Sequence, residues 1–580
     1  MIARIAPLRR LPANLDYFDY SIPDSLLPDI RPGSVVRIPF RHQHLTGVVL
    51  DIVPTSDQTH LEPITALTPT ELTRQQIELL KYLAVLYHLA PSTLLPFFLA
   101  SEPKKNCTLD KSEELSRQYS GTVNSAFHSW VIYDDWKTLE QYCQPATNSH
   151  GGQTLIVIPE YYLLPLAKKI VQDQPTIVLP AKQEKYAYWR AWNQARSAPI
   201  IIGTFPSLFL PFTKLQQLII LDAENTQFHR SEHNPRIHLA DWLSHYQRLY
   251  DCQLLLASPS PCSRLFQTTR NTALPVKSIE RKSARLLTID MTSERNSGSR
   301  GLLSQNALAA IDDSQRTLLY LNHYGTANMV ACGRCQWLAQ CDHCQRALSF
   351  NAGAKDLECW NCRQHQPAVG NCPQCGSAKL KLRSSGLSRL VREVTDIWPQ
   401  KKIALLSQRL TSTVTPAEVV IATSKVLSTD LTFDTAIAVQ PDNELWRPDF
   451  IATEELRRHL RQLLVRSQNL IIQTSNPSHY VYQSLANFKA YISEELAFRQ
   501  EFNYPPFADS YKIFIKDKPK AASISAELVT RIGSQSETVI VTQEPYFLVT
   551  RGSLSSGFID NLIKTYNNRI LIEINPYQWN

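Results

Sequence analysis

Short apolar runs alternate with longer helical patches over most of the chain after residue 150. Strands buried on both faces of a parallel sheet have this continuous apolar character, and helices must connect them. We therefore predict an α/β protein with two lobes, each built on a parallel sheet. The first lobe is expected to hold strands at 154–158, 199–202, 217–221 and 253–256. The second is expected to hold strands at 317–321, 402–406, 419–422, 435–439 and 470–473.

The two ends of the chain follow a more strand-like pattern. Near the start, segments 34–38 and 46–50 predict a β-hairpin, and a helical pattern follows at 71–89. Near the other end, a helical stretch precedes Tyr504-Pro505-Pro506-Phe507, and strand-like runs continue up to 570–574. These patterns predict a small β-rich N-terminal domain and a small α+β C-terminal domain.

Polar segments separate the predicted domains. Residues 102–127 are rich in Ser, Glu and Lys, which is typical of a linker. Residues 263–300 carry eight Lys and Arg against three Asp and Glu, so we expect a solvated basic connector, with phosphate contact as the alternative. The expected division is an N-terminal domain at 1–101, a linker at 102–127, the first lobe at 128–275, the basic connector at 276–300, the second lobe at 301–331 and 377–480, a zinc-binding insertion at 332–376 and the C-terminal domain at 481–580.

Eight of the twelve cysteines form four Cys-x-x-Cys pairs. Each pair can present two thiolates from one tight turn, and four thiolates complete the coordination of a structural zinc ion. Disulfides are the alternative, but the sequence shows nothing secretory. Five residues separate the first pair from the second and fourteen separate the second from the third, so we expect nested sites. The outer zinc is assigned to Cys332, Cys335, Cys372 and Cys375, and the inner zinc to Cys341, Cys344, Cys359 and Cys362.

The overall composition fits an ordinary soluble protein. Of 580 residues, 43% are hydrophobic and 19% are charged. No apolar run reaches the ~18 residues of a membrane span, and no signal-like stretch begins the sequence, so we expect a cytoplasmic protein without a membrane partner. The net charge of +8 is compatible with nucleic acid but does not identify a partner.

Taken together, the two lobes, the cysteine insertion and several short motifs resemble the PriA family of bacterial replication restart, over nearly the whole chain. The motifs are Phe18-Asp19-Tyr20, Pro32-Gly33, 36–40, Ile202-Gly203-Thr204, 208–212, Pro448-Asp449-Phe450 with Glu454, and Tyr504-Pro505-Pro506-Phe507. The resemblance implies RecA-like lobes, a double zinc ribbon in the second lobe, and an N-terminal domain that binds the 3′ end of a nascent DNA strand.

In such a domain Phe18 and Tyr20 would stack on a terminal base, and Asp19 would accept a hydrogen bond from the 3′-hydroxyl. The alternative is that these alternating aromatic residues fill a β core. Arg41 stands where the family has glycine, and a large cation there would either block the pocket or bind phosphate.

The chain departs from this helicase family where the family binds ATP. The phosphate loop falls on residues 131–138, where only Lys137 and Thr138 match and glycine is absent. Bulky residues resist the left-handed conformations that let such a loop wrap a phosphate. Asp134 and Asp135 would also repel the nucleotide's negative charge.

Other nucleotide motifs are altered as well. The family's Asp-Glu-Glu-His is Asp222-Ala223-Glu224-Asn225 here, so the catalytic carboxylate is lost. In the last motif Arg466 remains, but Asn469 replaces the final arginine that stabilises charge on the transferred phosphoryl group. We therefore expect no catalytic residues, no nucleotide-binding residues and no ATPase activity.

The sequence thus predicts a replication restart protein that binds forked or gapped DNA containing single strand, carries two zinc ions and helps other primosome or replication proteins to assemble. Two alternatives stay open. One is an active ATP-dependent 3′ to 5′ DNA helicase with divergent motifs, and the other is a zinc-ribbon scaffold with no DNA role.

Overall fold

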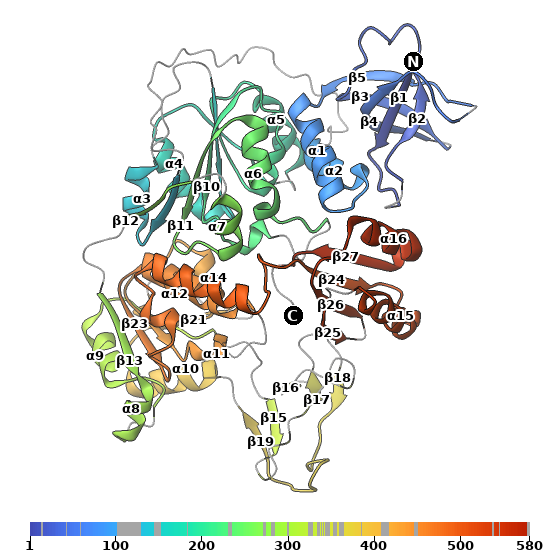
Figure 1. The fold of residues 1–580 in the computed structure, drawn as a ribbon. Coiled ribbons are helices and arrows are strands. Elements are labelled where there is room, and N and C mark those ends of the chain that lie inside the picture. The colour runs from blue at the N-terminus through green and yellow to red at the C-terminus, as the bar shows by residue number, and fades with distance from the viewer. Residues whose placement is uncertain are drawn as a thin grey trace. The chain divides into compact units, whose positions relative to one another are not determined.

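The computed structural model of the chain divides into two compact units (Figure 1). The first contains Met1–Ile279 and Arg499–Trp579, and the second contains Glu280–Phe498 and Asn580. The structure describes residues 1–576 except for gaps at 13–14, 42, 59, 101–128, 144–151, 182–183, 230–234, 271–273, 280–284, 299–300, 323–328, 333, 335–336, 338, 340–341, 343–347, 352–355, 359–364, 384–385, 408–416, 446–449, 536–538 and 545.

The first unit begins with a five-stranded antiparallel sheet in the order β2-β1-β4-β3-β5. Its strands are β1 (Ile2–Pro7), β2 (Phe18–Ser21), β3 (Ser34–Phe40), β4 (Gln43–Val53) and β5 (Ala66–Glu71), and the helices α1 (Arg74–Leu86) and α2 (Pro91–Phe98) follow. Val36 lies opposite Gly47, so the predicted hairpin is confirmed. A Cβ atom on Gly47 would lie 2.5 Å from the Ile5 side chain, so the close approach of β1 requires glycine.

A capping box fixes the start of α1. The Thr73 hydroxyl accepts a hydrogen bond from the Gln76 N–H at 3.2 Å, and the Gln76 side chain accepts one from the Thr73 N–H at 2.9 Å. The Gln76 amide also donates to the Phe209 carbonyl at 2.7 Å. The same side chain thus caps the helix and joins it to the lobe that follows.

Seven parallel strands form the sheet of that first lobe, in the order β12-β6-β11-β10-β7-β9-β8. They are β6 (Ser129–Tyr133), β7 (Gln153–Val157), β8 (Thr176–Val178), β9 (Ile200–Gly203), β10 (Leu215–Leu221), β11 (Gln253–Ser258) and β12 (Val276–Ile279). Its helices are α3 (Trp136–Tyr142), α4 (Leu164–Val171), α5 (Lys185–Gln194), α6 (Leu239–Tyr250) and α7 (Ser263–Arg270). The four predicted strands are present, whereas β6, β8 and β12 lie outside the predicted set.

The first unit is completed by a β-α-β-β-α-β domain near the end of the chain. Its antiparallel sheet has the order β25-β26-β24-β27. The elements are β24 (Ser510–Ile515), α15 (Ala521–Gly533), β25 (Val539–Glu544), β26 (Phe547–Arg551), α16 (Ser556–Tyr566) and β27 (Ile570–Ile574). Both helices contribute to the apolar core with the sheet, for example through Leu528, Leu562 and Ile513.

The second unit is built on six parallel strands in the order β13-β23-β22-β14-β21-β20. They are β13 (Arg285–Asp290), β14 (Thr317–Tyr320), β20 (Ile403–Leu406), β21 (Val419–Ala422), β22 (Phe433–Val439) and β23 (Ser467–Thr474). The helices are α8 (Met291–Asn296), α9 (Gln305–Asp313), α10 (Gly386–Ile397), α11 (Asp442–Leu445), α12 (Ala452–Arg466), α13 (Tyr480–Gln483) and α14 (Phe488–Glu501), whose last residues belong to the first unit. The prediction of two parallel sheets is therefore confirmed.

The cysteine-rich insertion follows β14 and forms its own antiparallel sheet, in the order β18-β17-β16-β15-β19. Its strands are β15 (Met329–Cys332), β16 (Ser349–Asn351), β17 (Asp356–Glu358), β18 (His365–Pro367) and β19 (Leu380–Arg383). The buried apolar cluster of its described residues consists of Val330, Ala339, Leu348 and Leu357. So small a core is typical of a domain that a metal stabilises.

The expected basic connector at 276–300 is wrong for most of its length. Strand β12 lies on the edge of the first sheet, and β13 lies on the edge of the second, where α8 follows it. The first three residues of β13 are exposed, which explains why the segment has a solvated character in the sequence. The predicted linker at 102–127 lies outside the described residues.

Within the described part of the chain, none of the helices combines the length and the apolar character that crossing a bilayer requires.

A buried charge cluster in the first unit joins the C-terminal domain to the first lobe. Glu573 on β27 is 1% exposed and pairs with the Arg236 guanidinium, and the His238 Nε2 lies 3.5 Å from its other oxygen. Burial alone raises the pKa of Glu573, but the contacts with His238 and Arg236 outweigh it, so this pKa lies below its ordinary value.

We expect Glu573→Gln to lower the free energy of unfolding by roughly 2–3 kcal/mol near neutral pH, because it leaves Arg236 unpaired. Since the folded-state pKa is depressed, the ion pair stabilises the protein above the unfolded-state pKa of about 4.3 and loses this effect as pH falls through the lower folded value. Thermal unfolding of both proteins from neutral to acid pH should show the difference shrinking in that acid range.

Glu527→Gln is the matched control, since the Glu527 side chain is 56% exposed in the same domain. Equal losses in the two variants at neutral pH would contradict a stabilising role for the buried pair.

Candidate functional site

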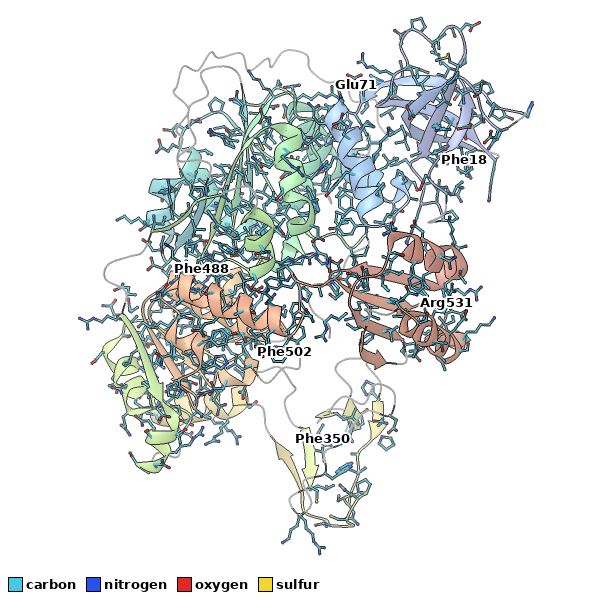
Figure 2. The ribbon with its side chains drawn as sticks, viewed as in Figure 1. Phe18, Glu71, Phe350, Phe488, Phe502 and Arg531 are labelled. Atoms are coloured by element: carbon cyan, nitrogen blue, oxygen red, sulfur yellow. The ribbon has the colours of Figure 1, made fainter. Side chains whose placement is uncertain are left out.

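The edge strand β2 carries the Phe18-Asp19-Tyr20 motif, of which Phe18 is labelled in Figure 2. Side chains alternate between the two faces of a strand, so Asp19 points to the face opposite Phe18 and Tyr20. On neighbouring β1, Arg4 lies opposite Asp19. The motif therefore divides into a charged face and an aromatic face.

Asp19 is held by its neighbours on the charged face. Its side chain is 11% exposed, the Ser56 hydroxyl donates to Oδ2 at 2.5 Å, and the Arg4 Nε lies 3.9 Å from Oδ1. Within the described residues, the buried Oδ1 has no hydrogen-bond partner. A buried acceptor of this kind favours a donor supplied by a ligand.

The two aromatic residues of the motif differ in their surroundings. Tyr20 is 5% exposed, and its hydroxyl donates to the Pro39 carbonyl at 2.9 Å. The structure therefore favours the core role for Tyr20 that the sequence left open. Phe18 is only half-buried, and its ring centre lies 5.3 Å from that of Phe40 in an edge-to-face pair.

Two exposed cations flank this aromatic pair. Arg41 has a φ of 54°, in the left-handed region that glycine adopts without strain. Its guanidinium carbon lies 5.9 Å from the Phe40 ring centre, and that of Arg9 lies 5.7 Å away. Arg9 is absent from the predicted site residues, and its signal in the sequence is the Arg9-Arg10 pair after β1. Aromatic rings beside arginines suit stacked bases and their phosphates.

The region that resembles a phosphate loop is closed by the chain itself. Asp135 caps α3, and its carboxylate accepts hydrogen bonds from the N–H groups of Lys137 at 2.9 Å and Thr138 at 3.2 Å. The Thr138 hydroxyl donates to the same carboxylate. Free N–H groups at a helix start are the groups that would bind a phosphate. Here a side chain of the protein takes that position.

The acidic residues after β10 are likewise bonded locally. The Asn225 amide donates to the Asp222 carboxylate at 2.9 Å, and the Ser258 hydroxyl donates to the Glu224 carboxylate. Asp222, Ala223 and Glu224 are all buried.

Arg466 and Asn469, which belong to the last of the altered nucleotide motifs, form hydrogen bonds within the second unit. Arg466 is 1% exposed and donates to the carbonyls of Leu427 at 2.6 Å and Thr429 at 3.0 Å. Asn469 donates to the Asp434 carbonyl at 3.3 Å. These contacts stabilise the loop before β22 and the pairing of β22 with β23.

Three of the predicted outer zinc ligands lie together. The sulfurs of Cys332, Cys372 and Cys375 all lie within 4.8 Å of one another, and those of Cys332 and Cys375 are 3.6 Å apart. Ligands at 2.3 Å from a tetrahedral zinc are about 3.8 Å from each other, so the geometry fits this ion and is far too long for a disulfide. The pairing of β15 with β19 and the left-handed Gly376 hold the two sides in place.

The remaining cysteines divide into two groups. Cys107, Cys335 and the four inner ligands, Cys341, Cys344, Cys359 and Cys362, lie outside the described residues. Cys143, Cys252 and Cys262 are buried in the first lobe, and burial raises the pKa of Cys252 to about 12, which makes its thiol unreactive. The structure therefore supports one cysteine cluster able to bind zinc.

The sequence is similar to those of known proteins. Residues 10–100 match the 3'DNA-binding domain (3'BD) of PriA. The replication restart protein PriA of Bacillus subtilis is 23% identical over 65% of this chain and 52% of its own length. The PriA of Haemophilus influenzae is 25% identical over 73% of this chain and 63% of its own length, and that of Rickettsia conorii is 23% identical over 99% and 95%.

PriA replication restart proteins are thus distant homologues of this chain over most of its length. The match spans about half the length of the Bacillus subtilis PriA. Among solved structures, Saccharomyces cerevisiae Dbp5 bound to Gle1 has a TM-score of 0.34 at 11% identity, covering 64% of this chain and 82% of that one. The helicase domain of Pyrococcus furiosus Hef has a TM-score of 0.26 at 10% identity, covering 62% and 96%. Scores this low support no further conclusion.

We expect Cys332→Ser to remove one zinc ion per chain, because the three remaining thiolates bind zinc less tightly than four. Elemental analysis of the purified protein measures this loss directly. Cys252→Ser, which alters a buried thiol of the first lobe that is not part of the cysteine cluster, should leave the zinc content unchanged. Equal zinc in all three proteins would show that the cluster does not hold the metal.

Proposed function

We propose that this chain is a replication restart protein that binds a free 3′ end of DNA through its N-terminal domain and does so without hydrolysing ATP. The observation that carries the proposal is the match of residues 10–100 to a 3'DNA-binding domain. Forked or gapped DNA is the expected partner, since such structures expose single strand and a strand end.

The geometry around Asp19 supports end recognition. Its Oδ1 is buried, lacks a hydrogen-bond partner among the described residues, and could accept a hydrogen bond from a 3′-hydroxyl. On the other face of β2, Phe18 and Phe40 offer rings for a base, while Arg9 and Arg41 offer charges for phosphates. A phosphate at the strand end would instead meet the negative charge of Asp19.

The absence of ATP turnover is supported by what replaces the nucleotide contacts. The Asp135 carboxylate accepts a hydrogen bond from an amide at the start of α3, and the Ser258 hydroxyl donates one to Glu224. The Arg466 guanidinium donates to backbone carbonyls. Ala223 supplies no carboxylate for water activation.

The cysteine insertion is proposed to hold two structural zinc ions. The clustering of Cys332, Cys372 and Cys375 supports the outer site. The inner site rests on the spacing of the other four cysteines in the sequence. We propose that the insertion and the lobes offer a platform for other primosome or replication proteins.

The end-recognition proposal predicts a preference for a 3′-hydroxyl over a 3′-phosphate on otherwise identical forks. A hydrogen bond to a charged carboxylate contributes about 1.5–3 kcal/mol, so the preference should be roughly tenfold or more. Asp19→Ala should bind both ends equally. Fluorescence anisotropy with labelled forks measures the four affinities.

Asp29→Ala serves as the matched control, because Asp29 is an exposed carboxylate in the same domain. This variant should retain the preference. A wild-type protein that binds both ends equally would refute end recognition.

If the chain does not hydrolyse ATP, the wild-type protein should release no phosphate when DNA is added. Lys137→Ala should give the same result. A coupled-enzyme assay with forked DNA checks both. Turnover that disappears in Lys137→Ala would identify the chain as a working ATPase instead.

A further inference from the structure

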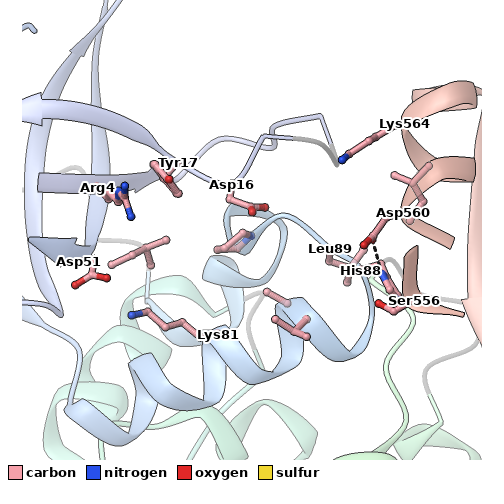
Figure 3. A pocket seen from close by; sticks show the side chains of 15 residues that line it. Arg4, Asp16, Tyr17, Asp51, Lys81, His88, Leu89, Ser556, Asp560 and Lys564 are labelled. Carbon is pink, nitrogen blue, oxygen red and sulfur yellow. Dashed lines mark hydrogen bonds and ion pairs between the residues drawn. The ribbon is translucent and has the colours of Figure 1, made fainter. Parts of the chain in front are cut away.

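A pocket of about 570 Å³ lies beside the N-terminal sheet, within the first unit (Figure 3). It is lined by residues of β1, the segment before β2, α1 and α16. Such a volume lies in the range that accommodates a small organic ligand. None of the residues that line this pocket belongs to the predicted site or to a motif named in the sequence analysis.

Three cations reach into the pocket from three elements. Arg4 comes from β1, Lys81 from α1 and Lys564 from α16. Figure 3 shows Lys81 and Lys564 at opposite sides, with Asp16 between them. Both lysines are exposed, and neither ammonium has an ion-pair partner among the described residues. Unpaired ammonium groups that converge on a cavity favour an anionic group in the ligand.

Arg4 connects the pocket with Asp19. Its guanidinium lies 4.9 Å from the centre of the Tyr17 ring, which also lines the pocket, and 3.9 Å from the Asp19 carboxylate. Arg4 therefore contacts both a wall of the pocket and the carboxylate proposed to accept the 3′-hydroxyl.

Three carboxylates, those of Asp16, Asp51 and Asp560, also line the pocket. Asp560 on α16 pairs with His88 at 2.7 Å, as the dashed line in Figure 3 marks. Burial raises the pKa of Asp16, and the nearby charge of Asp560 raises it further. Carboxylates in such a position can accept hydrogen bonds from the amino groups of a base or from a sugar hydroxyl.

We propose that this pocket binds a nucleotide of the single strand that leads to the 3′ end held at Asp19, with Lys81 and Lys564 on its phosphates and the Tyr17 ring against its base. The proposal rests on the proposed function and deepens it. A nucleotide combines the features that the walls complement, namely an anionic phosphate, a flat ring and hydrogen-bond donors. Because Lys564 belongs to α16, the C-terminal domain is part of the same DNA site.

The test is the binding of a labelled single strand to the double variant Lys81→Ala/Lys564→Ala over a series of salt concentrations. Losing two phosphate contacts should weaken binding about tenfold and reduce the slope of log K against log salt by about 1.4. The loss should be equal for 3′-hydroxyl and 3′-phosphate ends. Tyr17→Ala should also weaken binding, whereas Tyr17→Phe should not.

The control is Lys518→Ala/Lys520→Ala, which removes two exposed lysines of the C-terminal domain outside the pocket. An unchanged affinity and slope in the pocket variant, or an equal loss in the control, would overturn the proposal. Melting curves verify that all variants fold.

The same data separate this proposal from end recognition. Asp19→Ala should abolish the preference for a 3′-hydroxyl and leave the salt slope unchanged. Lys81→Ala/Lys564→Ala should keep the preference and reduce the slope. If the wild type shows no end preference but the lysine variant still loses slope, end recognition fails and the pocket stands. Deoxyadenosine monophosphate should compete only weakly, and full displacement of the strand by an equal concentration would assign the pocket to a free nucleotide and overturn the proposal.

Discussion

Buried polar groups need partners inside the protein, and local contacts meet this requirement in both units. In the first lobe the amides at the start of α3 are bonded to Asp135, and Glu224 is bonded to Ser258. In the second unit Arg466 is bonded to backbone carbonyls. A protein that binds nucleotide leaves such groups for its ligand. Here side chains and backbone carbonyls of the chain itself bond to these groups.

The same requirement ties the N-terminal and C-terminal parts of the first unit together. Gln76 and Tyr87 of the N-terminal domain bond to the first lobe, and Glu573 brings the C-terminal domain onto that lobe through Arg236. The N-terminal sheet that carries Asp19 therefore belongs to a unit in which contacts join three domains.

Much of the fold could be predicted from the sequence because its signals are local. Runs such as 217–221 are apolar throughout, so a buried parallel strand is the simplest interpretation, and Cys-x-x-Cys spacing places ligands without knowledge of the fold. Edge strands gave no such signal, since β13 begins with exposed residues and resembles a connector. Tyr20 illustrates the same limit: alternation identifies a strand, but only packing shows that its ring belongs to the core.

The pocket could not be predicted, because Arg4, Lys81 and Lys564 lie far apart in the sequence and belong to no motif. They lie close together because the first unit is built from two segments of the chain, one before and one after the second unit in the sequence. This order has a consequence for biosynthesis. When the ribosome has made the first 279 residues, Glu573 has not yet been translated. Arg236 and His238 remain without this partner until some 290 further residues have been added. The nascent first lobe thus passes through a period with uncovered charged surface, during which a chaperone or a premature contact could intervene.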